Sequence, residues 1–93
     1  MPFAVRYHPA VKAEDLPKLD AGMRERLRRA IEERLMTEPH KYGTPLRKSL
    51  HGYWKLRVGD YRVVYRIEQE QNVIVLIICH RKDVYQRVPD RLP

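Results

Sequence analysis

The sequence predicts an α+β domain in the order β-α-α-β-β-β, with two helices packed on one face of an antiparallel meander sheet that the N-terminal strand completes. Three observations predict this fold. Residues 53–68 alternate in polarity on both sides of Gly59-Asp60, as two strands of a hairpin do. Residues 73–79 are apolar at both parities, which is typical of a strand covered on both faces. Residues 23–35 repeat apolar side chains at helical spacing.

The N-terminal half supplies the first strand and both helices. Residues 3–7 alternate and predict a strand, and residues 11–19 predict a short helix that Pro17 limits in length. Asp20 is a suitable N-cap for a longer helix, which Pro39 and Gly43 end. The apolar stripe of that helix consists of Met23, Leu27, Ala30, Ile31 and Leu35.

The hairpin has a register that its turn determines. If Gly59-Asp60 is a two-residue loop, Trp54 faces Tyr65 in the core. Arg57 then lies directly across from Arg62, and like charges in that position destabilise a sheet. A chain that keeps this repulsion is expected to use it, and a cationic face of this kind suits RNA.

The remaining segments are shorter. Residues 40–45 predict a loop, and residues 46–50 predict an extended piece that leads into the hairpin. Residues 68–72 form a polar turn before the apolar strand, and the end of the chain is expected to fray after Pro89. Three consecutive strands therefore pair as a meander.

Length and composition narrow the class of protein. A chain of 93 residues predicts one domain, 1–93, with a small core. The single cysteine, Cys79, lies in an apolar run and is expected to be a small buried side chain without a disulfide partner. The N-terminus lacks a signal-peptide apolar region, and the run 73–79 is far shorter than the roughly 20 residues that span a bilayer. We expect a cytoplasmic protein with no membrane partner.

The positive charge is concentrated in the second half. Residues 1–40 carry 8 Lys/Arg against 7 Asp/Glu, whereas residues 41–93 carry 11 against 5, within a net charge of +7. This imbalance indicates a nucleic acid or an acidic protein as the partner. The outward face of the long helix is either solvated or leans on an RNA backbone; it carries Arg24, Glu25, Arg28, Arg29, Glu32 and Glu33.

The segment LRKSLHGYWKLRVGDYRVVYRIEQEQNVIVLIICHRKDVY, residues 46–85, resembles the C-terminal half of RelE-type toxins of the RelE/ParE superfamily. Its most specific pieces are WKLRVGDYRVVYRI and HRKDVY. The resemblance implies the toxin of a type II toxin–antitoxin pair that cuts mRNA, often in the ribosomal A site, and so stops translation and growth. It implies no metal and no cofactor, and an acidic antitoxin that lies across the cationic face or shifts the piece carrying Tyr85. The ParE branch shares the fold but poisons DNA gyrase.

The resemblance also assigns the site residues. The basic positions of the RelE active site fall on Lys55, Arg62 and Arg81, and the aromatic position falls on Tyr85. Some RelE proteins have a second lysine where this chain has Tyr53. Further cations expected to bind RNA are Arg57, Arg66, Lys48 and Lys82.

Metal-free RNA cleavage needs a base for the 2′-hydroxyl proton, positive groups for the phosphorane and an acid for the departing 5′-oxygen. The products are a 2′,3′-cyclic phosphate and a 5′-hydroxyl. Arg62 and Arg81 suit the phosphate, because guanidinium stays charged and can bond two oxygens at once. Lys55 or Tyr85 could be the base, and His80 is a possible acid, although on a continuous strand His80 and Arg81 point to opposite faces.

Each assignment has an alternative. Lys55 could belong to a solvated hairpin face, Arg62 could pair with Asp60 or Asp83, and Tyr85 could cover the core. At the level of function, the alternatives are a gyrase-binding toxin without nuclease activity and a degenerate module that only binds an antitoxin.

Overall fold

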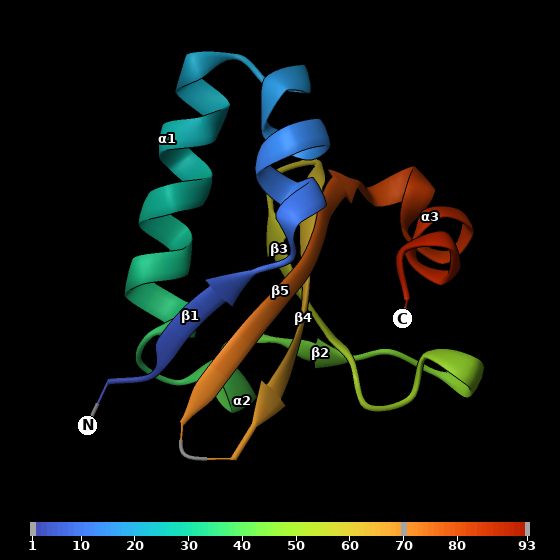
Figure 1. The fold of residues 1–93 in the computed structure, drawn as a ribbon. Helices are drawn as coiled ribbons and strands as arrows, with labels where there is room; N and C mark the ends of the chain where they lie inside the picture. The colour runs from blue at the N-terminus through green and yellow to red at the C-terminus, as the bar shows by residue number, and fades with distance from the viewer. Residues whose placement is uncertain (1, 70, 93) are drawn as a thin grey trace.

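The computed structural model describes residues 2–69 and 71–92, which form a five-stranded sheet between two unequal helical layers (Figure 1). The strand order is β1-β5-β4-β3-β2, with β1 parallel to β5 and every other neighbour antiparallel. The strands are β1 (Ala4–Tyr7), β2 (Thr44–Pro45), β3 (Trp54–Val58), β4 (Tyr61–Glu68) and β5 (Asn72–His80).

Helical segments occupy both sides of this sheet, with α1 on one side and α3 on the other (Figure 1). The α-helices are α1 (Ala21–Ala30), α2 (Pro39–Tyr42) and α3 (Val84–Arg91). Single turns of π-helix cover Val11–Asp15 and Ile31–Leu35, and 3₁₀ turns cover Leu16–Lys18, Lys48–Leu50 and Arg81–Asp83. Within residues 2–69 and 71–92, none of these helices is long and apolar enough to cross a bilayer.

The predicted fold class is confirmed, and α1 shows why the sequence specifies it. The Asp20 carboxylate accepts a hydrogen bond of 2.7 Å from the Met23 amide, as an N-cap should. Four of the five predicted stripe residues are buried against the sheet, and Met23 packs at their edge. α1 ends at Ala30, and the π-helical turn that continues it ends at Leu35, earlier than expected; Pro39 begins α2 instead of ending the long helix.

The hairpin register is confirmed. Trp54 pairs with Tyr65, and Arg57 pairs directly with Arg62. Gly59 has a φ of +61°, which suits the first central position of a type II′ turn and which a residue with a Cβ rarely adopts. The turn therefore places two arginines directly across from each other at the end of the hairpin.

A β-bulge in β5 distributes the apolar run between two cores. Val64 pairs with Ile77, but the next residue, Tyr65, pairs with Val75, so Leu76 is an extra residue without a counterpart on β4. Val73, Val75 and Ile78 join the core under α1, whereas Leu76, Ile77 and Cys79 join the core under α3. The strand is thus covered on both faces, as the apolar run predicts.

Helix α3 was not expected from the sequence. The prediction of a frayed end after Pro89 is wrong, because the helix runs through Pro89 to Arg91. Val84 and Val88 are buried against β4, β5 and the loop before β3. The loop before β3 also differs from the prediction of an extended piece at residues 46–50. The extended residues lie earlier, in β2, and Lys48–Leu50 is a 3₁₀ turn.

A buried carboxylate joins both helical layers to the sheet. Asp15 is only 2% exposed, and its Oδ2 accepts hydrogen bonds from the Ile78 amide at 3.0 Å and from Arg91 Nη1 at 2.6 Å. Its Oδ1 lies 3.7 Å from Arg87 Nη2. Because β1 ends before it reaches Ile78, the Asp15 side chain satisfies an amide of β5 on the side that β1 leaves uncovered. The α1 layer, β5 and α3 are therefore tied together at one point.

Cys79 gives a first testable prediction. The side chain is buried, as expected, and burial raises the pKa of its thiol to about 11. Because the thiolate is the reactive form, a pKa of about 11 in place of 9.0 lowers the reactive fraction about 100-fold at neutral pH. We expect labelling by iodoacetamide at neutral pH to be at least about 100-fold slower in the folded protein than in urea. Equal rates in the two conditions would contradict a buried thiol.

Candidate active site

Four candidate catalytic side chains line one cavity of about 440 Å³ on the α3 side of the sheet. They come from four elements: Lys55 from β3, Arg62 from β4, Arg81 from the 3₁₀ turn after β5, and Tyr85 from α3. Lys82 and Val84 complete the lining. Positions 55 and 62 lie on the same face because they have opposite parity to the hairpin residues that pack in the core under α1. Helix α3 then places the phenol of Tyr85 over that face.

Arg62 is positioned by the backbone of the hairpin turn. Its Nη1 donates hydrogen bonds of 3.0 Å to the Gly59 carbonyl and 2.9 Å to the Tyr61 carbonyl. Burial lowers the pKa of Arg62 from its ordinary value, and the positive charges of Arg57 and Arg81 lower it further. A guanidinium still stays protonated, so Arg62 contributes a fixed charge that lacks a carboxylate partner among the described residues.

The ion pair considered for Arg62 is made by Arg81 instead. Arg81 Nε lies 3.9 Å from the Asp60 carboxylate, and the Arg81 amide donates to the Asp60 carbonyl at 2.8 Å. Both side chains of this pair are more than half exposed, so their attraction is weak and a phosphate can compete for the guanidinium. The turn of the hairpin thus fixes the backbone of Arg81 and leaves its side chain available.

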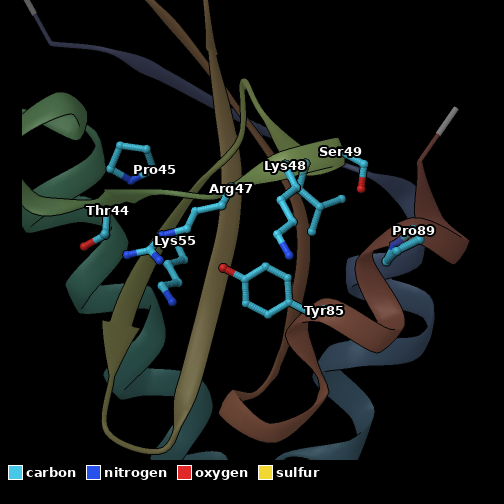
Figure 2. Close-up of a pocket in the computed structure, with 9 residues that line it drawn as sticks. Thr44, Pro45, Arg47, Lys48, Ser49, Lys55, Tyr85 and Pro89 are labelled. Atoms are coloured by element: carbon cyan, nitrogen blue, oxygen red, sulfur yellow. The ribbon is translucent and has the colours of Figure 1, made fainter.

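Lys55 and Tyr85 contact each other in the site. Lys55 Nζ lies 5.7 Å from the centroid of the Tyr85 ring, within the range of a cation–π contact. Tyr85 is 53% exposed, so it is not a cover for the core. In Figure 2 its hydroxyl projects from α3 into the space beside the Lys55 amine. An amine and a phenol, the two groups suited to proton transfer, therefore lie side by side.

A second cavity, of about 480 Å³, adjoins the first through this same pair. Figure 2 shows Lys48 reaching from the loop before β3 toward the Tyr85 ring, while the Arg47 side chain extends toward Thr44 and Lys55. Lys48 has a φ of +58°, in the left-handed region that glycine favours, so the loop holds this lysine at some cost in backbone strain. The two cavities together give a cationic groove around Lys55 and Tyr85.

The other predicted RNA-binding residues are dispersed. Lys48 and Lys82 each line one of the two cavities. Arg57 lines a separate cavity with arginines of α1, although it pairs with Arg62 across the hairpin. Arg66 is engaged by Glu68 at 2.6 Å, which neutralises its charge.

Two positions depart from the sequence-based chemistry. His80 pairs with Tyr61 on the face of the sheet that carries α1, and their rings meet edge-on at 5.7 Å. Its Nδ1 accepts a hydrogen bond from the Lys82 amide at 3.2 Å. The candidate acid therefore lies across the sheet from Arg62. Tyr53, which replaces a lysine of some RelE proteins, packs against the core under α3.

Sequence reasoning missed Arg47 as a site residue. It lines the second cavity with Thr44, Pro45 and Ser49 at the edge of the sheet. The signal available in the sequence was its position beside Lys48 in a loop that precedes the hairpin. A basic pair in such a loop is by itself a weak indication of a functional site. It becomes part of the site because α3 places Tyr85 opposite the loop.

Comparisons with known proteins agree with this fold. A family model described as the ParE toxin of the type II toxin–antitoxin system parDE matches residues 5–85. Toxin RelG of Mycobacterium tuberculosis is 35% identical over 88 residues, which are 94% of this chain and 100% of that protein. Toxin RelE of the same organism is 35% identical over 89 residues, or 91% and 92% of the two chains. The toxin–antitoxin complex RelBE2 of that organism contains a chain with a TM-score of 0.80 and 34% identity, covering 89% of this chain and 95% of that one.

Proposed function

The chain belongs to the ParE toxin family of type II toxin–antitoxin systems, as a RelE-type toxin of the RelE/ParE superfamily, and we propose that it arrests growth by cutting mRNA without a metal ion. The observation that carries this proposal is the shared cavity of Lys55, Arg62, Arg81 and Tyr85. Three cations surround the place where a phosphodiester would sit, and a phenol lies beside one of them. Such a constellation supports phosphoryl chemistry more directly than it supports protein binding alone.

The proposed mechanism divides the work between the arginines and the Lys55–Tyr85 pair. Arg62 and Arg81 bind the non-bridging oxygens and stabilise the extra negative charge of the phosphorane. In this step the phenolate form of Tyr85 takes the proton of the 2′-hydroxyl and becomes the phenol, and the 2′-oxygen attacks phosphorus. Lys55 gives a proton to the departing 5′-oxygen as the bond from phosphorus to that oxygen breaks. The products are a 2′,3′-cyclic phosphate and a 5′-hydroxyl.

We infer that the physiological inhibitor is an acidic antitoxin. The similar RelBE2 toxin is seen in complex with its antitoxin. A net charge of +7 on this chain favours a partner of opposite sign. The cavities at Lys55 remain open to solvent, and the substrate proposed for them is mRNA positioned in the ribosomal A site.

The experiment that tests the function is expression of the toxin in growing cells, with primer extension on abundant transcripts. We expect new 5′ ends during growth arrest, and Arg81→Ala should lower cleavage about 10²- to 10³-fold, because one preorganised charge at the phosphorane is lost. Arg6→Ala is the matched control, since it removes an exposed arginine from β1 at the opposite edge of the sheet. Growth arrest by both variants, with transcripts intact, would exclude the nuclease function.

A second candidate is a toxin that binds DNA gyrase. It is favoured by one observation, that the matching family model describes ParE toxins. The same experiment separates the two candidates, because a gyrase poison arrests growth and leaves transcripts uncut while DNA damage accumulates. Insensitivity of that arrest to Arg81→Ala would add to the case for gyrase.

A further inference from the structure

A second cluster of positive charge lies outside the proposed active site, on the α1 side of the hairpin. Four arginines line a cavity of about 410 Å³ there, which we call the arginine groove: Arg26, Arg29, Arg34 and Arg57. All four are exposed. Glu33 is the one acidic residue in the lining, so the groove has a strong excess of positive charge.

These arginines are not engaged in the ion pairs that neutralise their neighbour. Arg28, on another face of the same helix, bonds to the carboxylates of Glu25 and Glu32. Within residues 2–69 and 71–92, the four groove arginines form no such pair. Holding four like charges beside a single carboxylate opposes folding, and an anionic ligand would relieve this repulsion.

The local structure brings α1 close to the hairpin turn. A Cβ built on Gly59 would lie 2.9 Å from Arg26 Nη1, so this guanidinium lies close over the turn and would have to shift for any larger residue. The same glycine has the positive φ that the turn requires. Gly59 therefore serves the hairpin and the arginine groove at once.

Positive charge extends from the arginine groove to the proposed active site. Arg57 lines the groove and pairs directly across the hairpin with Arg62, and its charge lowers the pKa of that guanidinium. Strand β2 pairs only with Trp54 and Lys55, so it does not cover the edge of β3 at Arg57. A chain of phosphates can pass from the catalytic cavity over this open edge to α1.

The chemistry of the lining favours nucleic acid over an acidic peptide. Ala30 and Val58 are the two apolar residues of the arginine groove, and neither is large. Protein interfaces depend on buried aromatic and aliphatic anchors, for which this groove has no pocket. Guanidinium groups, in contrast, bind phosphate oxygens in pairs and need no apolar anchor.

We propose that the arginine groove binds the phosphate backbone of RNA that flanks the cleavage site, and so extends the substrate path around the edge of β3. This inference rests on the proposed nuclease function for the direction of the path. The binding itself does not depend on cleavage. The groove contacts no base edge in this arrangement, so it adds affinity without sequence preference.

The test measures RNA binding by fluorescence anisotropy with labelled oligonucleotides of about four and more than about 16 nucleotides. The variant is Arg26→Ser/Arg29→Ser/Arg34→Ser, and the control is Arg6→Ser/Lys12→Ser/Lys18→Ser, which removes the same charge from exposed positions elsewhere. We expect the groove variant to bind long RNA at least about tenfold more weakly, to bind short RNA unchanged, and to show a salt slope smaller by roughly 2 for three lost single-strand phosphate contacts. Matching thermal denaturation curves establish that both variants fold.

Three outcomes would overturn the proposal. An equal loss in the control variant would show a general effect of charge. An equal loss for short and long RNA would place the arginines in the catalytic site. Unchanged RNA binding with weaker antitoxin binding would make the groove a protein surface. Failure of the nuclease proposal gives a different result: the wild-type protein would then cut neither free RNA nor mRNA on ribosomes, whatever the binding measurements show. Comparing these two substrates also separates mRNA from ribosomal RNA as the source of the phosphates.

Discussion

Replacing Tyr85 with Phe or Lys55 with Ala should each slow RNA cleavage by about 10²- to 10⁴-fold, because each change removes one of the two proposed proton-transfer groups. Both side chains line the catalytic cavity, and neither is buried in the core. The measurement is single-turnover cleavage at saturating enzyme, so that binding effects do not contribute. A loss below about tenfold in both variants would remove the pair from the chemistry.

The two roles can be separated with a substrate in which sulfur replaces the departing 5′-oxygen. A thiolate leaves without a proton, so this substrate no longer needs an acid. If Lys55 is the acid, Lys55→Ala should cleave the sulfur substrate nearly as fast as the wild type does, while Tyr85→Phe remains slow. The opposite pattern would exchange the two assignments, and no rescue of either variant would place the acid elsewhere.

A matched control for these variants exists in the same chain. Tyr42 is exposed, and Lys41 Nζ lies 5.7 Å from its ring centroid, the same separation as in the Lys55–Tyr85 pair. Tyr42→Phe therefore removes a phenol from an equivalent cation–π contact outside the cavity. We expect it to leave cleavage unchanged.

Replacing Asp15 with Ala should cost about 3–5 kcal/mol of unfolding free energy, because it removes the buried carboxylate that the buried Arg91 guanidinium bonds to. The Arg91 side chain is only 8% exposed, and the Ile78 amide would also lose its acceptor. Small domains have about 5–15 kcal/mol in total, so this loss is a large share of the stability. Urea denaturation monitored by circular dichroism is the measurement.

Two further variants show that the effect belongs to the buried carboxylate. Asp15→Asn keeps an oxygen for the Ile78 amide and should lose less than Asp15→Ala does. Glu14→Ala removes an exposed carboxylate that lies 3.7 Å from the same arginine, and it should cost no more than about 1 kcal/mol. If Asp15→Ala were as mild as Glu14→Ala, the pair would not hold α3 in place.

Local signals were sufficient for the first helix layer and for the hairpin. A two-residue turn leaves one register for the strands that it joins, so the pairing of Arg57 with Arg62 followed from Gly59-Asp60 alone. The Asp20 cap and the apolar stripe likewise specified where α1 begins and which face it buries. These features depend on neighbours within a few residues, which a sequence displays directly.

The second face of the sheet depends on distant contacts, and the sequence did not reveal it. Pro89 weakens α3 locally, yet Val88 and Arg91 hold the helix against β5 and Asp15. Asp15 itself resembles any surface carboxylate on a short helix until the fold surrounds it. The sequence predicted the site only as a set of cationic and aromatic positions. Where Tyr85 lies relative to Lys48 and Arg47 depends on the packing of α3.

The extra residue in β5 also matters when homologous toxins are aligned. Leu76 shifts the phase of the strand, so residues on its two sides follow different parities relative to β4. A relative whose strand runs without this insertion needs a one-residue gap at that point. Without the gap, Arg81 and Tyr85 would be matched to neighbours of their true counterparts, and a functional enzyme could be misread as one that has lost its catalytic residues.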